Sequence, residues 1–105
     1  MTPLQQYAVR TTRYQDAVMI DMCDLDLVGR RLEQNGLVID ITREYYQQQV
    51  IELNSARELL EKCDIANLVG DRIVKQAIEM KMAKEASVKR ISGVPFLMIY
   101  KFQHR

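Results

Sequence analysis

The chain has 105 residues, of which 48% are hydrophobic and 28% charged, and its formal net charge is +1. These values fit one globular domain over residues 1–105 and exclude a collagen-like repeat, a coiled coil and a disordered tail. No apolar run reaches the roughly 18 residues of a membrane span, and the N-terminus does not have the basic and apolar regions of a secretory signal. We therefore expect a cytoplasmic protein that has no membrane partner.

The N-terminal part of the chain predicts two antiparallel strands. Gln6–Arg10 alternates, with Tyr7 and Val9 on one face, and Ala17–Met22 alternates more strongly. The six residues between them contain no Asn-Gly or Asp-Gly pair, which would indicate a tight hairpin. A longer loop over residues 11–16 is therefore expected.

A short helix and a third strand follow. Asp24 can cap a helical turn over residues 25–28, and Gly29 can end that turn in the left-handed conformation. Asn35-Gly36 is a strong turn signal, and Leu37–Ile41 then alternates as a strand whose odd-numbered residues face inward. This segment is therefore expected to be the third strand of the chain.

The middle of the chain has the residue pattern of a helix. Ser55 opens a capping box, and a stripe of apolar residues then continues at helical spacing over residues 56–69. Gly70 interrupts the stripe, so we expect one helix to end there and a second to begin with Asp71 as its cap. Asn67, just before this break, is assigned a structural role at the same turn.

The C-terminal part predicts a hairpin. Val88–Ile91 is a short strand, Gly93 to Pro95 is a turn, and Phe96–Phe102 is an apolar interior strand with helices on one side. Together, these elements predict an α+β fold with a small, mostly antiparallel sheet of about five strands packed against two or three helices.

No residue pattern indicates catalysis, a cofactor or a metal centre. Two distant cysteines, Cys23 and Cys63, and a single histidine, His104, cannot supply a zinc or iron site, although a carboxylate-only magnesium site stays open. We expect both cysteines to be reduced and buried, with a Cys23–Cys63 disulfide as the alternative. No glycine-rich phosphate loop or nucleophile motif is present, and no cofactor is expected.

Three segments together resemble a known family. Cys23–Arg30, Ile65–Val74 and Arg90–Pro95 are similar to the archaeal domain-of-unknown-function family numbered four-two-four, and the order of predicted elements agrees over nearly the whole chain. The resemblance implies an archaeal, cytosolic protein without an established activity.

Charge is distributed unevenly along the chain. Residues 1–70 carry seven basic and eleven acidic side chains, whereas residues 71–105 carry eight basic and three acidic ones. The simpler interpretation is a solvated surface whose basic groups pair with the acidic half; the functional one is a surface that faces a polyanion.

The leading functional hypothesis is a non-enzymatic module that binds RNA or a translation-associated RNA–protein assembly. Its candidate contacts are the basic side chains near the helix ends and the last hairpin: Arg30, Arg31, Arg72, Lys75, Lys89 and Arg90. One alternative is a protein-interaction module or homodimer that uses the apolar C-terminal strand. A second is a small-molecule enzyme with carboxylates around Asn67, Asp71 and Arg72.

Overall fold

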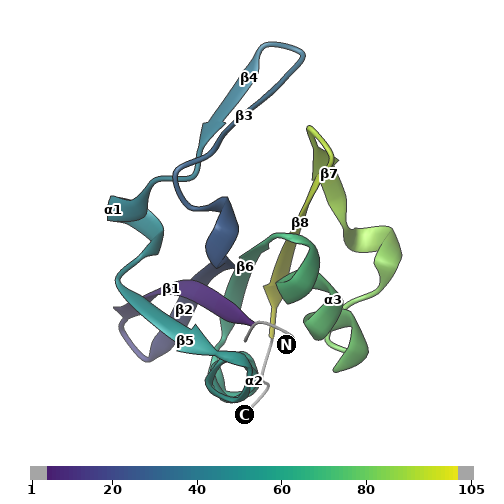
Figure 1. Ribbon diagram of the computed structural model, residues 1–105. Coiled ribbons are helices and arrows are strands. Elements are labelled where there is room, and N and C mark those ends of the chain that lie inside the picture. Colours follow the sequence, from purple (N-terminus) through teal and green to yellow (C-terminus); the bar gives the residue numbers. More distant parts are fainter. Residues whose placement is uncertain (1–4, 102–105) are drawn as a thin grey trace.

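The computed structural model describes residues 5–101, which form an α+β fold with one large sheet (Figure 1). The sheet strands are β1 (Gln6–Tyr14), β2 (Ala17–Asp24), β5 (Gln49–Glu52), β6 (Ile65–Val69), β7 (Lys89–Ile91) and β8 (Val94–Tyr100). A separate hairpin is formed by β3 (Arg31–Gln34) and β4 (Leu37–Asp40). The helices are α1 (Arg43–Tyr46), α2 (Leu53–Lys62) and α3 (Asp71–Glu79), with short 3-10 helices at Leu25–Leu27 and Glu85–Ser87.

The α+β class is confirmed, but the sheet is larger than predicted and mixed. Over the described residues it has six strands in the order β5-β1-β2-β6-β8-β7. The central pair, β2 and β6, is parallel, and the other neighbouring pairs are antiparallel. The expectation of about five mostly antiparallel strands is corrected because the sequence interpretation did not recognise β5 and β6.

The predicted loop over residues 11–16 is mostly strand. β1 and β2 pair continuously from Tyr7 to Tyr14, and the connection is a tight turn in which Gln15 has a φ of 55°. Thr11, Thr12 and Tyr14 are residue types that favour strands, which explains why the hairpin extends this far.

The predicted helix over residues 56–69 is wrong in its second half. α2 ends at Lys62, and residues 65–69 form β6, the strand at the centre of the sheet. Ala66 and Leu68 on one face of β6 and Ile65 on the other are all apolar, so their spacing resembles a helical stripe. Asn67 consequently lies in the middle of a strand and not at a turn.

Two predicted helix caps are also corrected. α2 begins at Leu53 with Glu52 at its N-cap position, so Ser55 lies inside the first turn and does not cap it. α3 has Gly70 at its N-cap position and Asp71 as its first residue. Gly70 therefore follows a strand, where its φ of 120° turns the chain into the helix.

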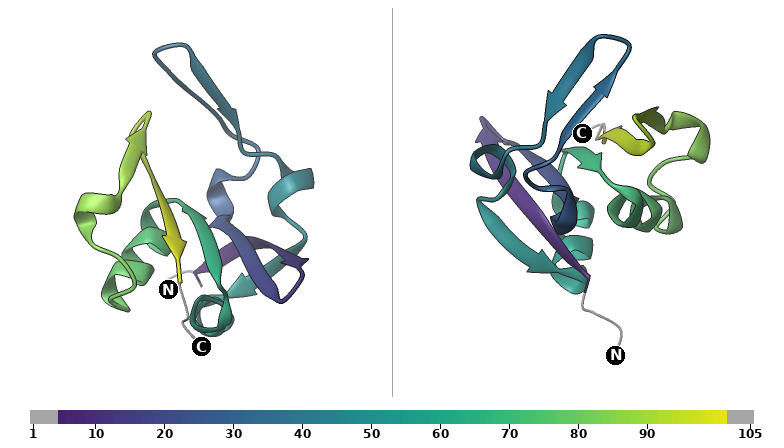
Figure 2. Two further views of the ribbon diagram at one scale, coloured as in Figure 1. Left: turned by 180° about the vertical axis from the view of Figure 1, so that it is seen from behind. Right: turned by 45° about the horizontal axis from the view of Figure 1, so that its top comes forward.

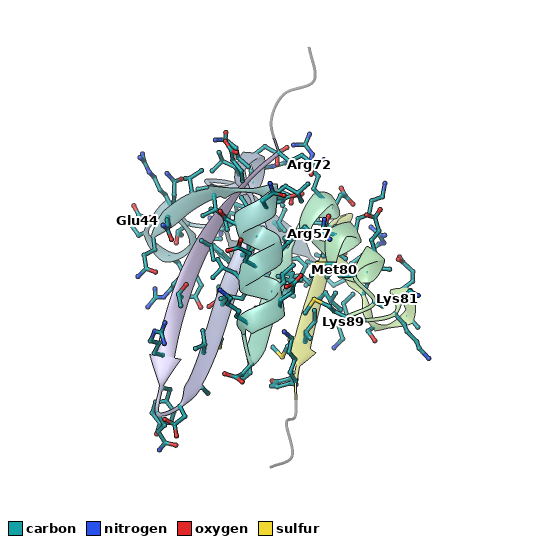
Figure 3. The ribbon with its side chains drawn as sticks, turned by 90° about the horizontal axis from the view of Figure 1, so that it is seen from below. Glu44, Arg57, Arg72, Met80, Lys81 and Lys89 are labelled. Atoms are coloured by element: carbon teal, nitrogen blue, oxygen red, sulfur yellow. The ribbon has the colours of Figure 1, made fainter. Side chains whose placement is uncertain are left out.

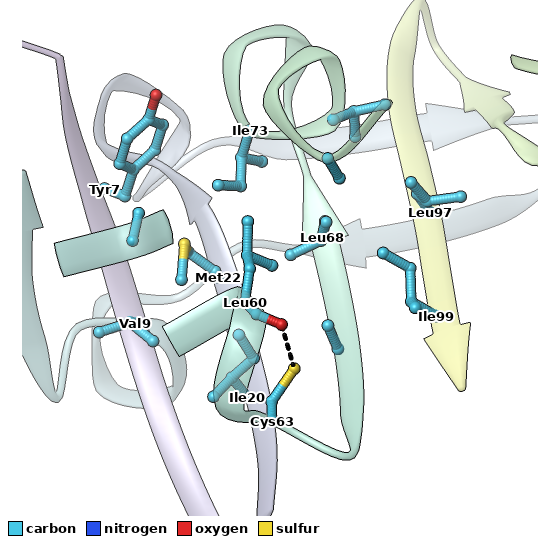
Figure 4. Packing of buried hydrophobic residues seen from close by; sticks show 14 of the residues in the cluster. Tyr7, Val9, Ile20, Met22, Leu60, Cys63, Leu68, Ile73, Leu97 and Ile99 are labelled. Carbon is cyan, nitrogen blue, oxygen red and sulfur yellow. Dashed lines mark hydrogen bonds between the residues drawn. The ribbon is translucent and has the colours of Figure 1, made fainter. Parts of the chain in front are cut away.

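The helices α2 and α3 cover one face of the sheet, which we call the helix face (Figures 1 and 2). The buried side chains packed there include Tyr7, Ile20, Met22, Leu60, Leu68, Ile73 and Leu97 (Figure 4). Both cysteines are free and buried, as predicted. The disulfide alternative is wrong, because Cys63 packs in this cluster whereas Cys23 belongs to a second cluster on the opposite face.

The β3–β4 hairpin projects from the body of the molecule (Figure 1). Its turn, Asn35-Gly36, has positive φ angles of 51° and 84°, as the two-residue turn of a tight hairpin requires. Leu32 and Ile41 at the base are buried, but Leu37 near the tip is 50% exposed. The prediction that the odd-numbered residues of this strand face inward is therefore correct at Ile41 and wrong at Leu37, because the tip of the hairpin extends beyond the core.

The last hairpin turns at Ser92-Gly93, where φ is 52° and 80°. Gly93 lies in the turn as predicted, but Pro95 is a buried residue of β8. β8 is an interior strand, as predicted, although Met98 and Tyr100 on its second face are 53% and 54% exposed. Phe102, the predicted end of this strand, lies outside the described residues. No helix within residues 5–101 is long and apolar enough to cross a membrane.

Candidate functional site

The face of the sheet opposite α2 and α3 is only partly covered. The β3–β4 hairpin, α1 and the first 3-10 helix pack over the end near Cys23 and Val69. The remainder, which we call the open face, presents Arg10, Thr12, Tyr14, Met19, Asp21, Ile65, Asn67, Met98 and Tyr100. Tyr14, Met98 and Tyr100 are among the most exposed large hydrophobic side chains of the described chain.

The strand register aligns a polar row across this face. Arg10 of β1 lies opposite Asp21 of β2, Asp21 lies beside Asn67 of β6, and Asn67 lies opposite Met98 of β8. Directly paired residues share a face of a sheet, so the four side chains form one line perpendicular to the strands. The sequence separates Asp21 from Asn67 by 46 positions, and the parallel β2–β6 pair brings them together.

Asp21 is the most unusual member of the row. Its side chain is only 3% exposed, and its Oδ1 accepts a hydrogen bond from Nδ2 of Asn67 at 3.1 Å. Its second oxygen, Oδ2, is buried, and it is the one such side-chain N or O atom of the described residues that meets no donor at hydrogen-bond geometry. The Tyr45 hydroxyl lies beside this carboxylate, because burial and then the interaction with Asp21 raise the pKa of Tyr45. Because a buried oxygen without a partner destabilises the fold, such an atom calls for an explanation, and ligand binding is one.

Two tyrosines of α1 lie over the same row. Thr42 caps α1 by accepting the Tyr45 amide at 3.2 Å, and the Tyr45 and Tyr46 rings meet edge to face at 4.9 Å. The guanidinium of Arg10 stands 4.7 Å from the Tyr45 ring centroid, a cation–π contact. Burial, followed by the charges of Cys23 and Asp21, raises the pKa of Tyr46 to about 12. Its hydroxyl therefore keeps its proton at neutral pH and is available as a donor.

A cavity of about 520 Å³ opens beside this row. The side chains around it that carry polar or aromatic groups are Asp21, Tyr46, Asn67, Ser87, Lys89 and Phe96. A larger and more open depression of about 890 Å³ lies along β8 between Met98 and the segment around Met82. We place the candidate site in the smaller cavity, because Asp21 and Asn67 both line it.

The six basic residues proposed from sequence lie in different places. Lys89 is the one that lines the cavity beside Asp21. Lys75 and Arg90 border a separate depression of about 420 Å³ together with acidic side chains, and Arg72 borders another with Asp26. Arg30 and Arg31 lie at the base of the projecting hairpin, and Figure 3 shows Arg72 well apart from Lys89.

Several of these basic groups have acidic partners at the surface. Arg90 lies 3.8 Å from Asp71 and 3.6 Å from Glu85, Lys75 lies 4.0 Å from Glu79, and Arg31 lies 3.5 Å from Glu33. Lys101 instead donates to the carbonyls of Leu60 and Glu61 at the end of α2. Part of the basic excess after residue 70 is thus used within the fold.

The residues of the enzyme hypothesis do not share a cavity. Asn67 lines the cavity on the open face, Asp71 lies in the depression beside Arg90, and Arg72 lies near Gln6. No group of three or more His, Cys, Asp or Glu side chains within residues 5–101 is arranged to hold a metal ion.

The sequence interpretation missed Asp21, Arg10, Tyr45 and Tyr46 as site residues. A signal for Asp21 is present: it is the one acidic residue inside the apolar strand Ala17–Cys23, on the face opposite Ile20 and Met22. No such signal marks its partner Asn67, because nothing local predicts which strands are neighbours.

Comparison with known proteins supports the fold. The family model described as "Protein of unknown function (DUF424)" matches residues 12–102. The crystal structure of an uncharacterized conserved protein from Methanopyrus kandleri, an archaeon, superposes with a TM-score of 0.75 at 20% sequence identity. The superposition covers 95% of this chain and 96% of that one. No curated protein matches the chain.

Proposed function

The chain belongs to the DUF424 family, whose function is unknown, and we propose from its open face that it is a binding module for single-stranded RNA. The observation that carries the proposal is the combination of groups on one partly uncovered sheet surface. A hydrogen-bonding pair, Asp21 and Asn67, lies on this surface. Tyr45 lies over the row beside Asp21, Tyr100 lies two positions along β8 from the residue opposite Asn67, and the exposed Tyr14 lies farther along β1. Sheet surfaces of this composition suit single strands, because bases stack on aromatic rings and offer their edges to polar groups.

Two basic side chains are placed to contact the backbone of such a strand. Arg10 lies on β1 at one end of the polar row, and Lys89 lies on β7 beyond the other end. A strand that crosses the sheet between them would place its bases over the central strands. With about two phosphate contacts, the logarithm of the affinity should fall against the logarithm of salt with a slope of about −1.4.

The test is a fluorescence-polarisation titration with a short single-stranded RNA and with a duplex of the same sequence, at several salt concentrations. We expect binding to the single strand, weaker binding to the duplex, and the shallow salt slope given above. Lys89→Ala and Arg10→Ala should each weaken binding and reduce the slope. Lys75→Ala is the matched control, because Lys75 is exposed on α3 and pairs with Glu79.

The proposal fails if no single strand binds at low salt. It also fails if the Lys75→Ala variant loses as much affinity as the Lys89→Ala variant, because the binding would then follow overall charge and not the open face.

A second candidate function is self-association or protein binding along β8. β7 pairs with Val94–Phe96 only, so β8 continues past the end of its neighbour toward Tyr100. The depression of about 890 Å³ lies along this part of β8, and Met98 beside it is 53% exposed. An added strand could occupy such an edge. Sedimentation of the protein at high concentration tests this candidate: a monomer that Met98→Glu leaves unchanged would exclude self-association.

A further inference from the structure

We propose that the cavity beside Asp21 and Asn67 binds one guanine base. This inference deepens the proposed function, because it assigns a base preference to a site on the face where the RNA strand would lie. It starts from the buried oxygen of Asp21, which meets no donor at hydrogen-bond geometry and belongs to a side chain that lines the cavity.

Two of the side chains that line the cavity, Asp21 and Asn67, carry acceptor oxygens. Nδ2 of Asn67 donates to Oδ1 of Asp21 at 3.1 Å and also approaches Sδ of Met19 at 3.8 Å. Because the amide nitrogen is directed at these atoms, the carbonyl oxygen of Asn67 is the group that remains for a ligand. Oδ2 of Asp21 is the second such group, and a carboxylate oxygen can only accept.

An acceptor pair selects a ligand edge with two neighbouring donors. Among the four RNA bases, the Watson–Crick edge of guanine alone has this arrangement, with its ring N1–H beside its exocyclic amino group. Adenine and cytosine each place a ring acceptor beside their amino group, and uracil has one N–H between two carbonyls. These three bases would therefore bring an acceptor against the Asp21 or Asn67 oxygen, which is unfavourable for a buried pair.

The rest of the cavity suits a nucleotide. Its volume of about 520 Å³ falls within the usual range of small-molecule sites. Phe96 and Tyr46 supply aromatic surface, and the Tyr46 hydroxyl, which stays protonated, can donate to a carbonyl such as guanine O6. Lys89 and Ser87 also border the cavity and provide a cation and a hydroxyl for a phosphate.

The experiment compares short oligouridines that carry a single central guanosine, adenosine, cytidine or inosine. We expect the guanosine oligomer to bind at least about tenfold more tightly than the adenosine and cytidine ones, the discrimination typical of a bidentate contact to a base. Inosine retains N1–H but has no amino group, so the affinity of the inosine oligomer should lie between that of the guanosine oligomer and those of the adenosine and cytidine oligomers. Free guanosine monophosphate is titrated in parallel to separate a base within a strand from a free nucleotide.

Asp21→Asn is the decisive variant, because it replaces one acceptor oxygen by an amide of the same shape. We expect it to remove most of the guanosine preference while the affinity for plain oligouridine changes little. Asp26→Asn is the matched control, because Asp26 is an exposed carboxylate in the separate depression beside Arg72. The wild-type comparison of guanosine with inosine tests the same contact even if the Asp21→Asn variant does not fold.

The outcomes separate the two proposals. Equal affinity for all four oligomers overturns the guanine site but leaves the RNA-binding function in place. If the oligomers do not bind but guanosine monophosphate does, and Asp21→Asn abolishes that binding, the guanine site stands and the RNA function is overturned. If neither ligand binds, both proposals are overturned.

Discussion

Asp24 and Gly70 are coupled at the point where β6 passes into α3. The Asp24 carboxylate accepts the backbone N–H groups of Arg72 at 2.9 Å and of Ile73 at 3.0 Å, so a residue of β2 caps a helix that begins 47 positions later. A Cβ atom on Gly70 would stand 2.5 Å from Cγ of Asp24. The sequence predicted that Asp24 caps the short helix that follows it. That prediction is wrong, because the Asp24 side chain makes no capping hydrogen bond to that helix.

Asp24→Ala should destabilise the protein by about 2 kcal/mol, because it leaves two helix N-terminal amides without their acceptor. Asp24→Asn keeps one acceptor oxygen and should cost about half as much. Chemical denaturation measures both changes. Asp26→Ala is the control, since Asp26 is exposed and makes no such contact, and an equal loss in Asp26→Ala would contradict the capping role.

Gly70→Ala should destabilise the protein by about 2 kcal/mol or more, because φ is 120° and the added methyl group meets the Asp24 carboxylate. In the double variant with Asp24→Ala the contacts with the carboxyl atoms are removed, whereas the backbone strain and the contact with Cβ of residue 24 at 3.0 Å remain. The two free-energy changes should therefore sum to more than the change in the double variant. If the free-energy changes of the two single variants add up to that of the double variant, the contact between residues 24 and 70 does not contribute to the loss of stability.

Lys101→Met should lower the stability by about 1 kcal/mol. The ammonium group donates to the carbonyls of Leu60 and Glu61, which belong to the last turn of α2. The Leu60 carbonyl also accepts from the Cys63 thiol at 3.4 Å. Thermal unfolding measures the change. Lys84→Met is the comparison, because Lys84 is exposed; an equal shift in both variants would indicate a general charge effect.

Neither cysteine should react with iodoacetamide in the folded protein near pH 8. Burial, reinforced by the charges of Asp24 and Asp26, raises the pKa of Cys23 to about 12, and burial also raises the pKa of Cys63. Since the thiolate is the reactive form, alkylation should require unfolding. Mass spectrometry with and without denaturant checks this, and rapid labelling of Cys23 under native conditions would contradict its placement under the hairpin.

Stability should decrease as the pH rises above about 9. The pKa of Tyr46 is 10.0 in the unfolded chain and about 12 in the folded protein, so folding favours the protonated phenol. The resulting stabilisation is complete below pH 10 and is lost as the pH rises through 12. Cys23 acts in the same direction between 9.0 and about 12.

Tyr46→Phe should reduce this alkaline loss without abolishing it, because Cys23 still titrates. Denaturation midpoints measured across the range provide the test. An identical pH profile in the wild type and the variant would mean that Tyr46 is not buried as described.

The sequence predicted those parts of the fold whose signals are local. The alternation in Ala17–Met22 identified β2, and Asn35-Gly36 identified the turn of the β3–β4 hairpin. β6 was not recognised because Ile65 is apolar although it lies on the open face, so the apolar residues of Ile65–Val69 continue the apolar spacing of α2 by coincidence. The length of the first hairpin was also missed, since its turn at Gln15 is not one of the usual glycine-containing pairs.

The candidate site was less predictable than the fold for a related reason. Asp21 and Asn67 meet only because β2 and β6 are parallel neighbours, and a parallel pairing leaves no local trace in either strand. The uneven charge along the chain does not mark one surface, because Arg90 and Lys75 lie beside acidic side chains, and Lys101 donates to the end of α2.

The cap that Asp24 places on α3 also bears on how the chain folds. The first turn of α3 acquires its acceptor only when β2 and β6 have come together, across a separation of 48 residues. Contacts of such long range slow the search for the native state, since the intervening loop must close before the contact is gained. We therefore expect α3 to be consolidated late, with the parallel pair as the rate-determining contact and the β3–β4 hairpin, whose pairing is local, already formed.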